Sequence, residues 1–272
     1  MNWRQARCAK NILWNIAMTL FTWATPAFVS GAPVDHTWVT SYDSRLNPFP
    51  DIQAVIAAHE DFWYCWGGFH SQGRALGSRN GDLNLARCLV TPNSDSVAVY
   101  AARGTIFTYG VDGVCHQLAN QVLYATGVSG AALTVAGAKG YPVSIAIYGT
   151  YGLQHAAWQS KIAGCTGGGH PLTTGPSMTT PSPQPDEFAA QVGQVLGSKL
   201  DVAAQLLHLR AQFQASAAAQ AHSLVLPTVD ELNARNQNFL DEAAKLLSED
   251  EYFDIFGIRP GEKINLVLPA KP

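Results

Sequence analysis

Twenty residues, 166–185, divide the chain into two parts with different patterns. Their sequence, TGGGHPLTTGPSMTTPSPQP, is made almost entirely of Gly, Pro, Ser and Thr, which cannot propagate a helix or supply a strand with core side chains. We interpret them as a linker or a long loop. Residues 33–165 before it are rich in Gly, Trp and Tyr, and residues 186–272 after it carry a helical period. The sequence therefore predicts an α+β core domain followed by a helical C-terminal region.

Within residues 33–165, short apolar or aromatic runs bounded by Gly, Pro, Asn or Asp predict strands. The predicted strands are 36–42, 61–66, 97–101, 105–109 and 143–148. Residues 115–126 instead place Leu118 and Val122 at helical spacing before a Gly, which is typical of a helix and its C-terminal end. We expect a small mixed or antiparallel sheet with a helix that begins at Cys115.

The last 87 residues predict a helical hairpin. Apolar residues from Phe188 through Leu207 keep a 3.6-residue period along one long helix. Two capping-box patterns mark further helix starts, Thr228 with Glu231 and Ser248 with Glu251. The region holds seven basic and twelve acidic residues. We expect its apolar stripe to pack on itself or on the core domain, with binding of a protein partner as the alternative.

The first 32 residues have the pattern of a secretory signal peptide. They contain Arg4, Arg7 and Lys10 but no acid, an apolar stretch over 12–24 and a small-residue ending, Ser30-Gly31-Ala32. The apolar stretch is shorter than the roughly 20 residues that span a bilayer, which disfavours a membrane anchor. We expect cleavage before Pro33, a secreted or periplasmic protein, and no membrane span after the signal is removed.

Export affects the cysteines, because an oxidising compartment permits disulfides. Removal of the signal would leave Cys65, Cys88, Cys115 and Cys165, and no pair has the C-x-x-C spacing of a zinc ribbon or a redox motif. One interpretation is a structural disulfide between Cys115 and Cys165, with Cys65 bonded to Cys88. A second interpretation leaves Cys115 free as a nucleophile, and a third leaves it as a buried free thiol.

Charge and motif content argue against several classes of protein. The net charge is −3, only 14% of residues are charged and no Lys/Arg-rich run occurs, so nucleic-acid binding is disfavoured. The histidines show no H-x-x-x-H spacing, and the Gly runs lack the Lys of a phosphate loop. We expect neither a metal nor a cofactor.

The segment most suggestive of chemistry is 107–127, FTYGVDGVCHQLANQVLYATG. Cys115 opens its helix, where free backbone N–H groups and the helix dipole favour a thiolate and can hold an oxyanion. A thiolate nucleophile also needs an imidazole. His36 in HTWVTSYD and His155 in QHAAW are the candidates, while His116 ranks lower because adjacent helical residues do not face each other.

The motif G-x-C-x-x-x-A at Gly113, Cys115 and Ala119, with HTWV or HAAW, resembles the papain-like thiol hydrolases in the broad sense. These include the NlpC/P60 peptidases and the transglutaminase-like proteins, in which a helix-starting Cys faces a His on an adjacent sheet. With His36 as base, the order matches circularly permuted members, and with His155 it is the ordinary order. Residues 113–185 contain no Asp or Glu, which favours His36.

The resemblance implies an exported cysteine-dependent amide hydrolase or acyl-transferase, of the thiol protease type, with Cys115 as nucleophile. Its substrate would be a peptide or a cell-wall peptide. The aromatic run FWYCWGGFH could line a substrate pocket through Trp63 and Trp66, although such runs are often core strands. The alternative function is a non-catalytic secreted binding module stabilised by disulfides. The state of Cys115 discriminates between the two.

Overall fold

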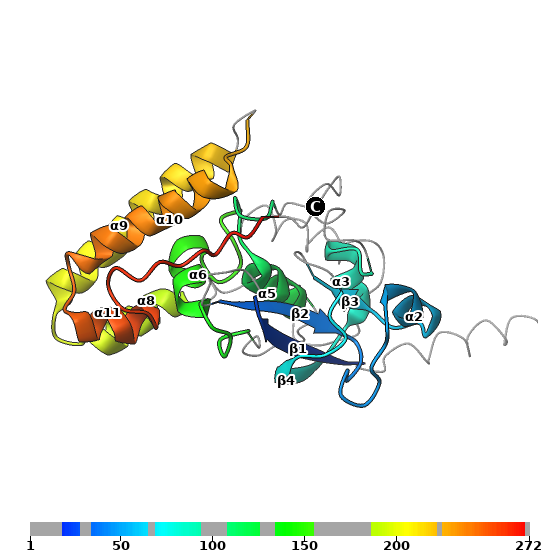
Figure 1. The fold of residues 1–272 in the computed structure, drawn as a ribbon. Helices are drawn as coiled ribbons and strands as arrows, with labels where there is room; N and C mark the ends of the chain where they lie inside the picture. Colours follow the sequence, from blue (N-terminus) through cyan, green and yellow to red (C-terminus); the bar gives the residue numbers. More distant parts are fainter. Residues whose placement is uncertain are drawn as a thin grey trace, which may run out of the picture.

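The computed structural model describes residues 18–27, 34–64, 69–93, 108–125, 134–154, 186–221 and 225–269. A small antiparallel sheet lies beside helix α5, and a layer of C-terminal helices packs beyond α6 (Figure 1). This arrangement confirms the predicted α+β fold with a cysteine-bearing helix and C-terminal helices.

The sheet has four strands in the order β3-β2-β1-β4, and every neighbouring pair is antiparallel. The strands are β1 (Met18–Pro26), β2 (Asp35–Thr40), β3 (Phe62–Trp63) and β4 (Arg74–Gly81). The predicted strand 36–42 corresponds to β2, and 61–66 contains β3. In the register of the β1–β2 pair, Trp23 lies opposite Trp38.

The two faces of the sheet are buried against different neighbours. On one face Leu20, Ala24 and Val39 share a core with α5. On the other face Trp23 and Trp38 belong to an aromatic cluster that includes Phe62 and Tyr64. Because side chains alternate along a strand, successive residues of β2 belong to these two environments in turn.

Strand β1 lies within the first 32 residues, the segment that the sequence assigns to a cleaved signal peptide. It pairs with β2 on one side and β4 on the other, and its Leu20 and Trp23 side chains are 0% exposed. Cleavage before Pro33 would remove the strand that joins β2 to β4. Cleavage stays a prediction, whereas in the folded structure this segment is part of the sheet.

Helices fill the rest of the first part of the chain. Their bounds are α2 (Ile52–Ala57), α3 (Leu83–Leu89), α5 (Cys115–Ala125) and α6 (Tyr141–Tyr148). Helix α5 confirms the prediction for 115–126. The predicted strand 97–101 and most of 105–109 lie outside the described residues.

The predicted strand 143–148 is wrong, because these residues form α6. Gly140 adopts a left-handed conformation with a φ of 77° just before the helix, and Pro142 lies in the first turn, where its fixed φ suits a helix. All but one of the eight residues are buried. Burial on every side removes the amphipathic period that would have identified a helix from the sequence.

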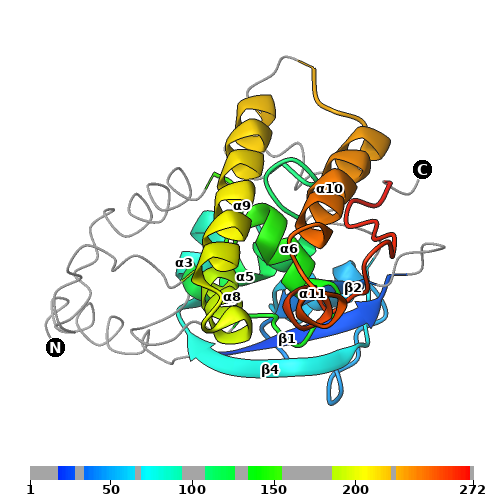
Figure 2. The same cartoon turned by 90° about the vertical axis from the view of Figure 1, so that its left-hand side faces the viewer.

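The C-terminal region forms α8 (Glu187–Leu196), α9 (Leu200–Ala221), α10 (Val229–Ala244) and α11 (Glu249–Phe256). The single long helix expected after Phe188 is divided, because α8 ends at Gly197 and α9 begins at Leu200. Helices α9 and α10 form a hairpin, with α8 and α11 at one end (Figure 2). Both predicted capping boxes, at Thr228 and Ser248, are present.

The helical layer and the sheet layer share one continuous core. Phe188 of α8, Leu206 of α9 and Phe239 of α10 are buried in the same cluster as Leu118 of α5. Arg210 of α9 is 7% exposed and donates hydrogen bonds to the last carbonyls of α6. The predicted packing of the C-terminal helices on the core domain is therefore present. The predicted linker, 166–185, lies outside the described residues.

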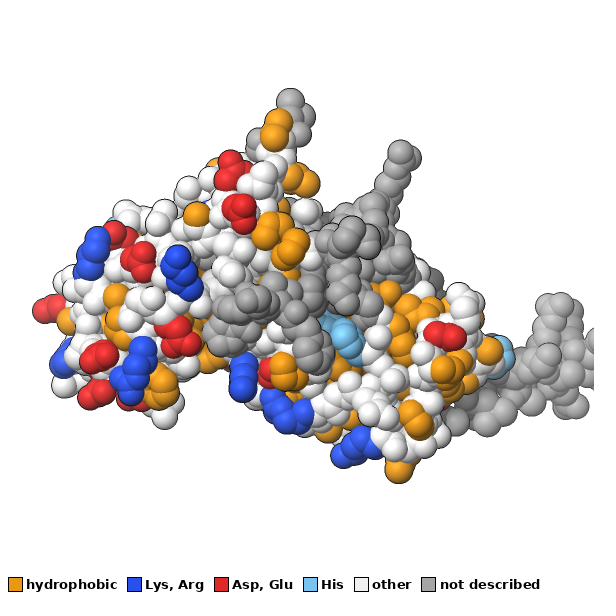
Figure 3. Space-filling view, viewed as in Figure 1, with side chains coloured by type: hydrophobic (Ala, Val, Ile, Leu, Met, Phe, Trp, Pro, Cys, Tyr) orange, Lys and Arg blue, Asp and Glu red, His pale blue; other side chains and the backbone are white. Residues whose placement is uncertain are grey.

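The visible surface carries mixed charge. On the face in Figure 3, acidic and basic side chains lie interspersed over the C-terminal helices. None of the helices in the described ranges combines the length and the apolar character that a membrane span requires.

Candidate functional site

Cys115 begins α5 directly after a tight loop. Within the loop, the Gly110 N–H donates to the Gly113 carbonyl over 2.7 Å, and the Thr108 N–H donates to the Asp112 carboxylate over 2.8 Å. Gly110 has a φ of 77°, a region that glycine adopts without steric cost. The loop thus leads directly into α5, whose first residue is Cys115.

The first turn of α5 lacks a side-chain cap at its usual position. Val114 precedes the helix and has no side-chain oxygen, although its carbonyl accepts from the Gln117 and Leu118 N–H groups. The Gln117 side chain instead accepts from the Val114 N–H over 3.0 Å. The N–H groups of Cys115 and His116 thus lie near the Cys115 sulfur, and both act to lower the pKa of the thiol.

The Cys115 sulfur lies against strand β2. Its thiol is 3.8 Å from the Asp35 carbonyl oxygen, and the nearby Thr37 acts to lower the pKa of the thiol. Burial raises the pKa of Cys115 above its ordinary value, and the hydrogen bonds from Thr37, His116 and Cys115 itself act in the opposite direction. In this structure Cys115 is therefore a protonated thiol surrounded by donors that would favour a thiolate.

Cys115 is a free cysteine, which corrects the interpretation of a Cys115–Cys165 disulfide. The thiol is 8% exposed and belongs to the core that also contains Leu118. Cys88 of α3 is disulfide-bonded. Cys65 and Cys165 lie outside the described residues, so the pairing of the remaining cysteines stays a prediction.

His36 lies next to Thr37 in β2 and lines the same small cavity as Cys115. Its ring stacks on Trp38 at a centroid distance of 5.7 Å and meets the His70 ring at 5.3 Å. Burial lowers the pKa of His36 well below 6.5, and the His70 and His116 rings lower it further. His36 is therefore neutral at physiological pH, the state in which an imidazole can accept a proton. His155, the other predicted base, lies outside the described residues.

His116 links α5 to both neighbouring elements. Its Nδ1 lies 2.9 Å from the Ser144 hydroxyl of α6, and its Nε2 lies 3.1 Å from the Asp35 carbonyl oxygen of β2. Burial lowers the pKa of His116 to about 4. The ring is therefore neutral and turned toward Asp35 and Ser144, which agrees with its lower rank as a base.

Asp35 and Thr37 were not singled out from the sequence. The Asp35 carboxylate accepts from the Arg74 guanidinium and from the Lys139 N–H, both over 2.9 Å, which holds this end of β2 in place. Its backbone carbonyl meets both Cys115 and His116. These contacts come largely through backbone atoms. The only signal in the sequence is that Asp35 and Thr37 lie on either side of His36.

The cavity beside Cys115 is small, about 10 Å³, which is at the limit of what one water molecule requires. It is lined by Val34, Asp35, His36, Tyr109, Val114, Cys115, His116, Leu266 and Leu268. Cys115 and His36 thus both line this cavity, but the His36 ring stacks on Trp38, on the face of β2 opposite Thr37 and Cys115. Two leucines from the far end of the chain also line the cavity.

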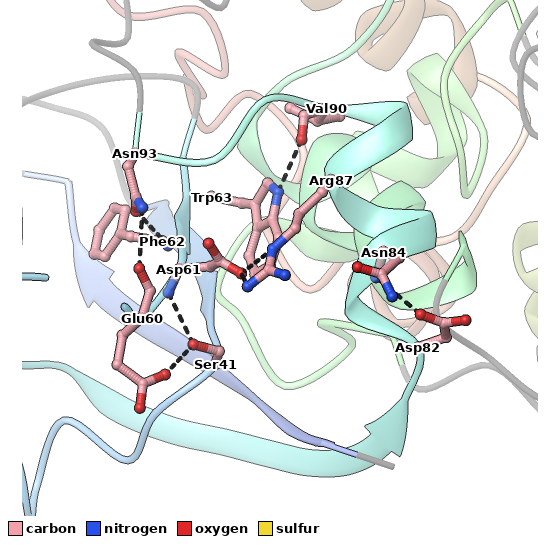
Figure 4. A network of polar contacts seen from close by, with 10 residues as sticks. All are labelled: Ser41, Glu60, Asp61, Phe62, Trp63, Asp82, Asn84, Arg87, Val90 and Asn93. Carbon is pink, nitrogen blue, oxygen red and sulfur yellow. Dashed lines mark hydrogen bonds and ion pairs between the residues drawn. The ribbon is translucent and has the colours of Figure 1, made fainter. Parts of the chain in front are cut away.

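Trp63, a predicted substrate-binding residue, is inside the core. It is 2% exposed, and its indole N–H donates to the Val90 carbonyl over 3.1 Å (Figure 4). The neighbouring Asp61 pairs with Arg87 of α3 at 2.7 Å. These contacts tie β3 to α3 and leave the Trp63 ring covered, so its role here is structural. Trp66 lies outside the described residues.

Among the described residues, no three His, Cys, Asp or Glu side chains lie close enough together to hold a metal ion. No family model matches the chain, and neither does any curated protein or solved structure. The resemblance to papain-like thiol hydrolases therefore rests on the short motifs alone.

Proposed function

We propose that this protein is a cysteine-dependent amide hydrolase or acyl-transferase in which Cys115 is the nucleophile and His36 is the base. The observation that carries the proposal is the set of donors around the free Cys115 thiol. The N–H groups of Cys115, His116 and Thr37 all act on the sulfur. Donors in this arrangement lower the pKa of a cysteine once water reaches it, and can hold the oxyanion of an acyl intermediate.

The proposed reaction uses one proton transfer and one covalent intermediate. The His36 imidazole accepts the Sγ proton, and the thiolate adds to the carbonyl carbon of the amide. The C–N bond then breaks, the leaving amine takes the proton from His36, and the acyl group stays on Cys115 as a thioester. Water, or an amine in a transferase, attacks the thioester and returns the thiol. Catalytic hydrogen bonds in such sites often tighten only when substrate is bound.

We further propose a peptide or a cell-wall peptide as substrate, and a secreted or periplasmic location. The motif resemblance supports the substrate class, and the basic N-terminus with its apolar stretch supports the location. Because that stretch forms β1 of the sheet, export of the folded protein requires that residues 18–26 stay attached. The alternative is a non-catalytic secreted binding module; Cys115 is free and buried, and a thiol that stays unreactive would favour this module.

The test is an amine-release assay on a casein digest and on purified peptidoglycan fragments. The Cys115→Ala variant should lose all amide hydrolysis while its Tm stays nearly unchanged, because no disulfide is lost. Hydrolysis that survives in Cys115→Ala would overturn the proposal.

The base is tested in the same assay with His36→Gln and His155→Gln as a matched pair. We expect hydrolysis to fall in His36→Gln and to continue in His155→Gln. The opposite result would remove His36 from the mechanism and assign the proton transfer to His155.

A further inference from the structure

The chain returns to the candidate site after its last helix. Beyond α11, residues 264–268, INLVL, which we name the strap, lie between the C-terminal helices and α5. Figure 1 shows this red segment running back from α11 across α6 toward α5 and β2. Its apolar side chains are 1–4% exposed: Ile264, Leu266, Val267 and Leu268. A short segment without regular secondary structure is thus almost completely buried.

The strap is held through its backbone by two side chains. The Asn233 amide of α10 donates to the Val267 carbonyl over 2.7 Å and accepts from the Val267 N–H over 3.1 Å. The Tyr109 hydroxyl accepts from the Leu268 N–H over 3.2 Å and lies 3.4 Å from the Leu266 carbonyl oxygen. Both attachments are hydrogen bonds between uncharged groups, which are of modest net strength.

The strap also packs against the loop that leads to Cys115. A Cβ atom at Gly110 would lie 2.6 Å from Cγ1 of Val267, so Val267 occupies the space above this glycine. Tyr109, which holds the strap, immediately precedes Gly110. The strap is therefore in contact with the loop that positions the predicted nucleophile.

The leucines of the strap cover Cys115. Leu266 and Leu268 line the cavity together with Cys115 and His36, and the space left is about 10 Å³. An attacking atom and its target must approach to about 3–3.5 Å, and a peptide carbonyl with its flanking chain is far larger than this cavity. No peptide can reach the sulfur while the strap is in place.

We propose that the strap gates Cys115, so that the structure is a closed state and the thiol becomes accessible when residues 264–268 leave the cavity. That the strap regulates catalysis rests on the proposed function. That the strap controls access to the thiol does not, because it depends only on the fold. Displacement would admit water and substrate beside the donors around Sγ. The attachments that must break include the two hydrogen bonds of Asn233 to Val267.

The gate is tested by alkylation of the folded, non-reduced full chain with iodoacetamide, with labelling at Cys115 followed by mass spectrometry. Asn233→Ala removes both bonds to Val267, and we expect Cys115 to react about ten- to hundredfold faster. The matched control is Thr228→Ala, which weakens the same helix by removing its cap but does not touch the strap. It should leave the rate near that of the unmodified chain.

A second variant, which lacks residues 263–272, should react at least as fast as Asn233→Ala. If that variant does not fold, Asn233→Ala alone decides the result. An unchanged rate in Asn233→Ala, or an equal rise in Thr228→Ala, would overturn the gate.

Labelling separates the gate from the proposed catalysis. Rapid labelling of Asn233→Ala without amide hydrolysis by any variant would support the gate and contradict the proposed function. Amide hydrolysis by the unmodified chain at the rate of Asn233→Ala would support the function and contradict the gate.

Discussion

Removal of residues 1–32, the predicted signal peptide, is expected to unfold the protein, because it takes β1 out of the middle of the sheet. Among the side chains lost are two large apolar ones that are 0% exposed, Leu20 and Trp23. Truncation of a buried Leu costs about 2–5 kcal/mol and of a buried Trp about 3–5 kcal/mol. Their combined loss, about 5 kcal/mol or more, approaches the total stability of about 5–15 kcal/mol of a typical protein.

Hydrogen bonding adds to this loss. The Trp23 indole N–H donates to the Thr40 hydroxyl over 2.8 Å, and β1 supplies backbone partners to both β2 and β4. Without β1, the facing edges of these two strands would have no partner in the sheet.

The assay compares thermal unfolding, followed by circular dichroism, of three proteins: the full chain, a variant lacking residues 1–17, and a variant lacking residues 1–32. The variant lacking 1–17 retains β1 and is the matched control. We expect cooperative transitions for the first two and none for the third. If the third variant unfolds cooperatively at the temperature of the full chain, β1 is dispensable and cleavage before Pro33 is compatible with folding.

Two further predictions concern stability. Arg210→Met should lower the free energy of unfolding by about 2–3 kcal/mol in urea titrations, because Arg210 binds the last carbonyls of α6 and pairs with Asp186. Lys199→Met, which breaks an exposed ion pair, should cost at most about 1 kcal/mol, and an equal cost for both would contradict the buried role of Arg210. The folded-state pKa of His116, about 4, is below its ordinary 6.5, so the unfolded chain binds more protons between these values and stability falls as the pH is lowered. His116 should make the free energy of unfolding in urea about 3 kcal/mol lower at pH 4 than at pH 7. This difference between the two pH values should shrink in His116→Gln, and an unchanged difference would contradict the role of His116.

Local signals in the sequence predicted the elements that depend on local interactions. The capping boxes at Thr228 and Ser248 are formed by residues three positions apart, and both are present. Helix α5 was recognised from its helical period. The sequence predicts a strand where α6 forms, because a short helix buried on nearly all sides has no polar face.

The sheet was predicted only in part. The residues of β1 were interpreted as the apolar stretch of a leader, since a leader and a buried strand are both apolar. Strand β4, RALGSRNG, contains two glycines and is largely exposed, so it shows neither alternation nor an apolar run. Both strands are recognisable only through pairing with residues far away in the chain.

The candidate site likewise contains residues that the sequence identifies and residues that it does not. Cys115 was identified because a cysteine at a helix start is visible in the sequence. The contributions of Asp35 and Thr37 were not, because they act mainly through backbone atoms. The strap is attached to Asn233, which is 34 residues away from Val267, and no local pattern marks such a contact.

The central claim is that the donors at the start of α5 make Cys115 a nucleophile once the strap is displaced. It is tested most directly by the pH dependence of Cys115 alkylation in Asn233→Ala. The rate should follow an apparent pKa below the value of about 8.5 that is ordinary for a cysteine, because the N–H groups of Cys115, His116 and Thr37 favour the thiolate. An apparent pKa at or above 8.5 in the accessible thiol would contradict the claim.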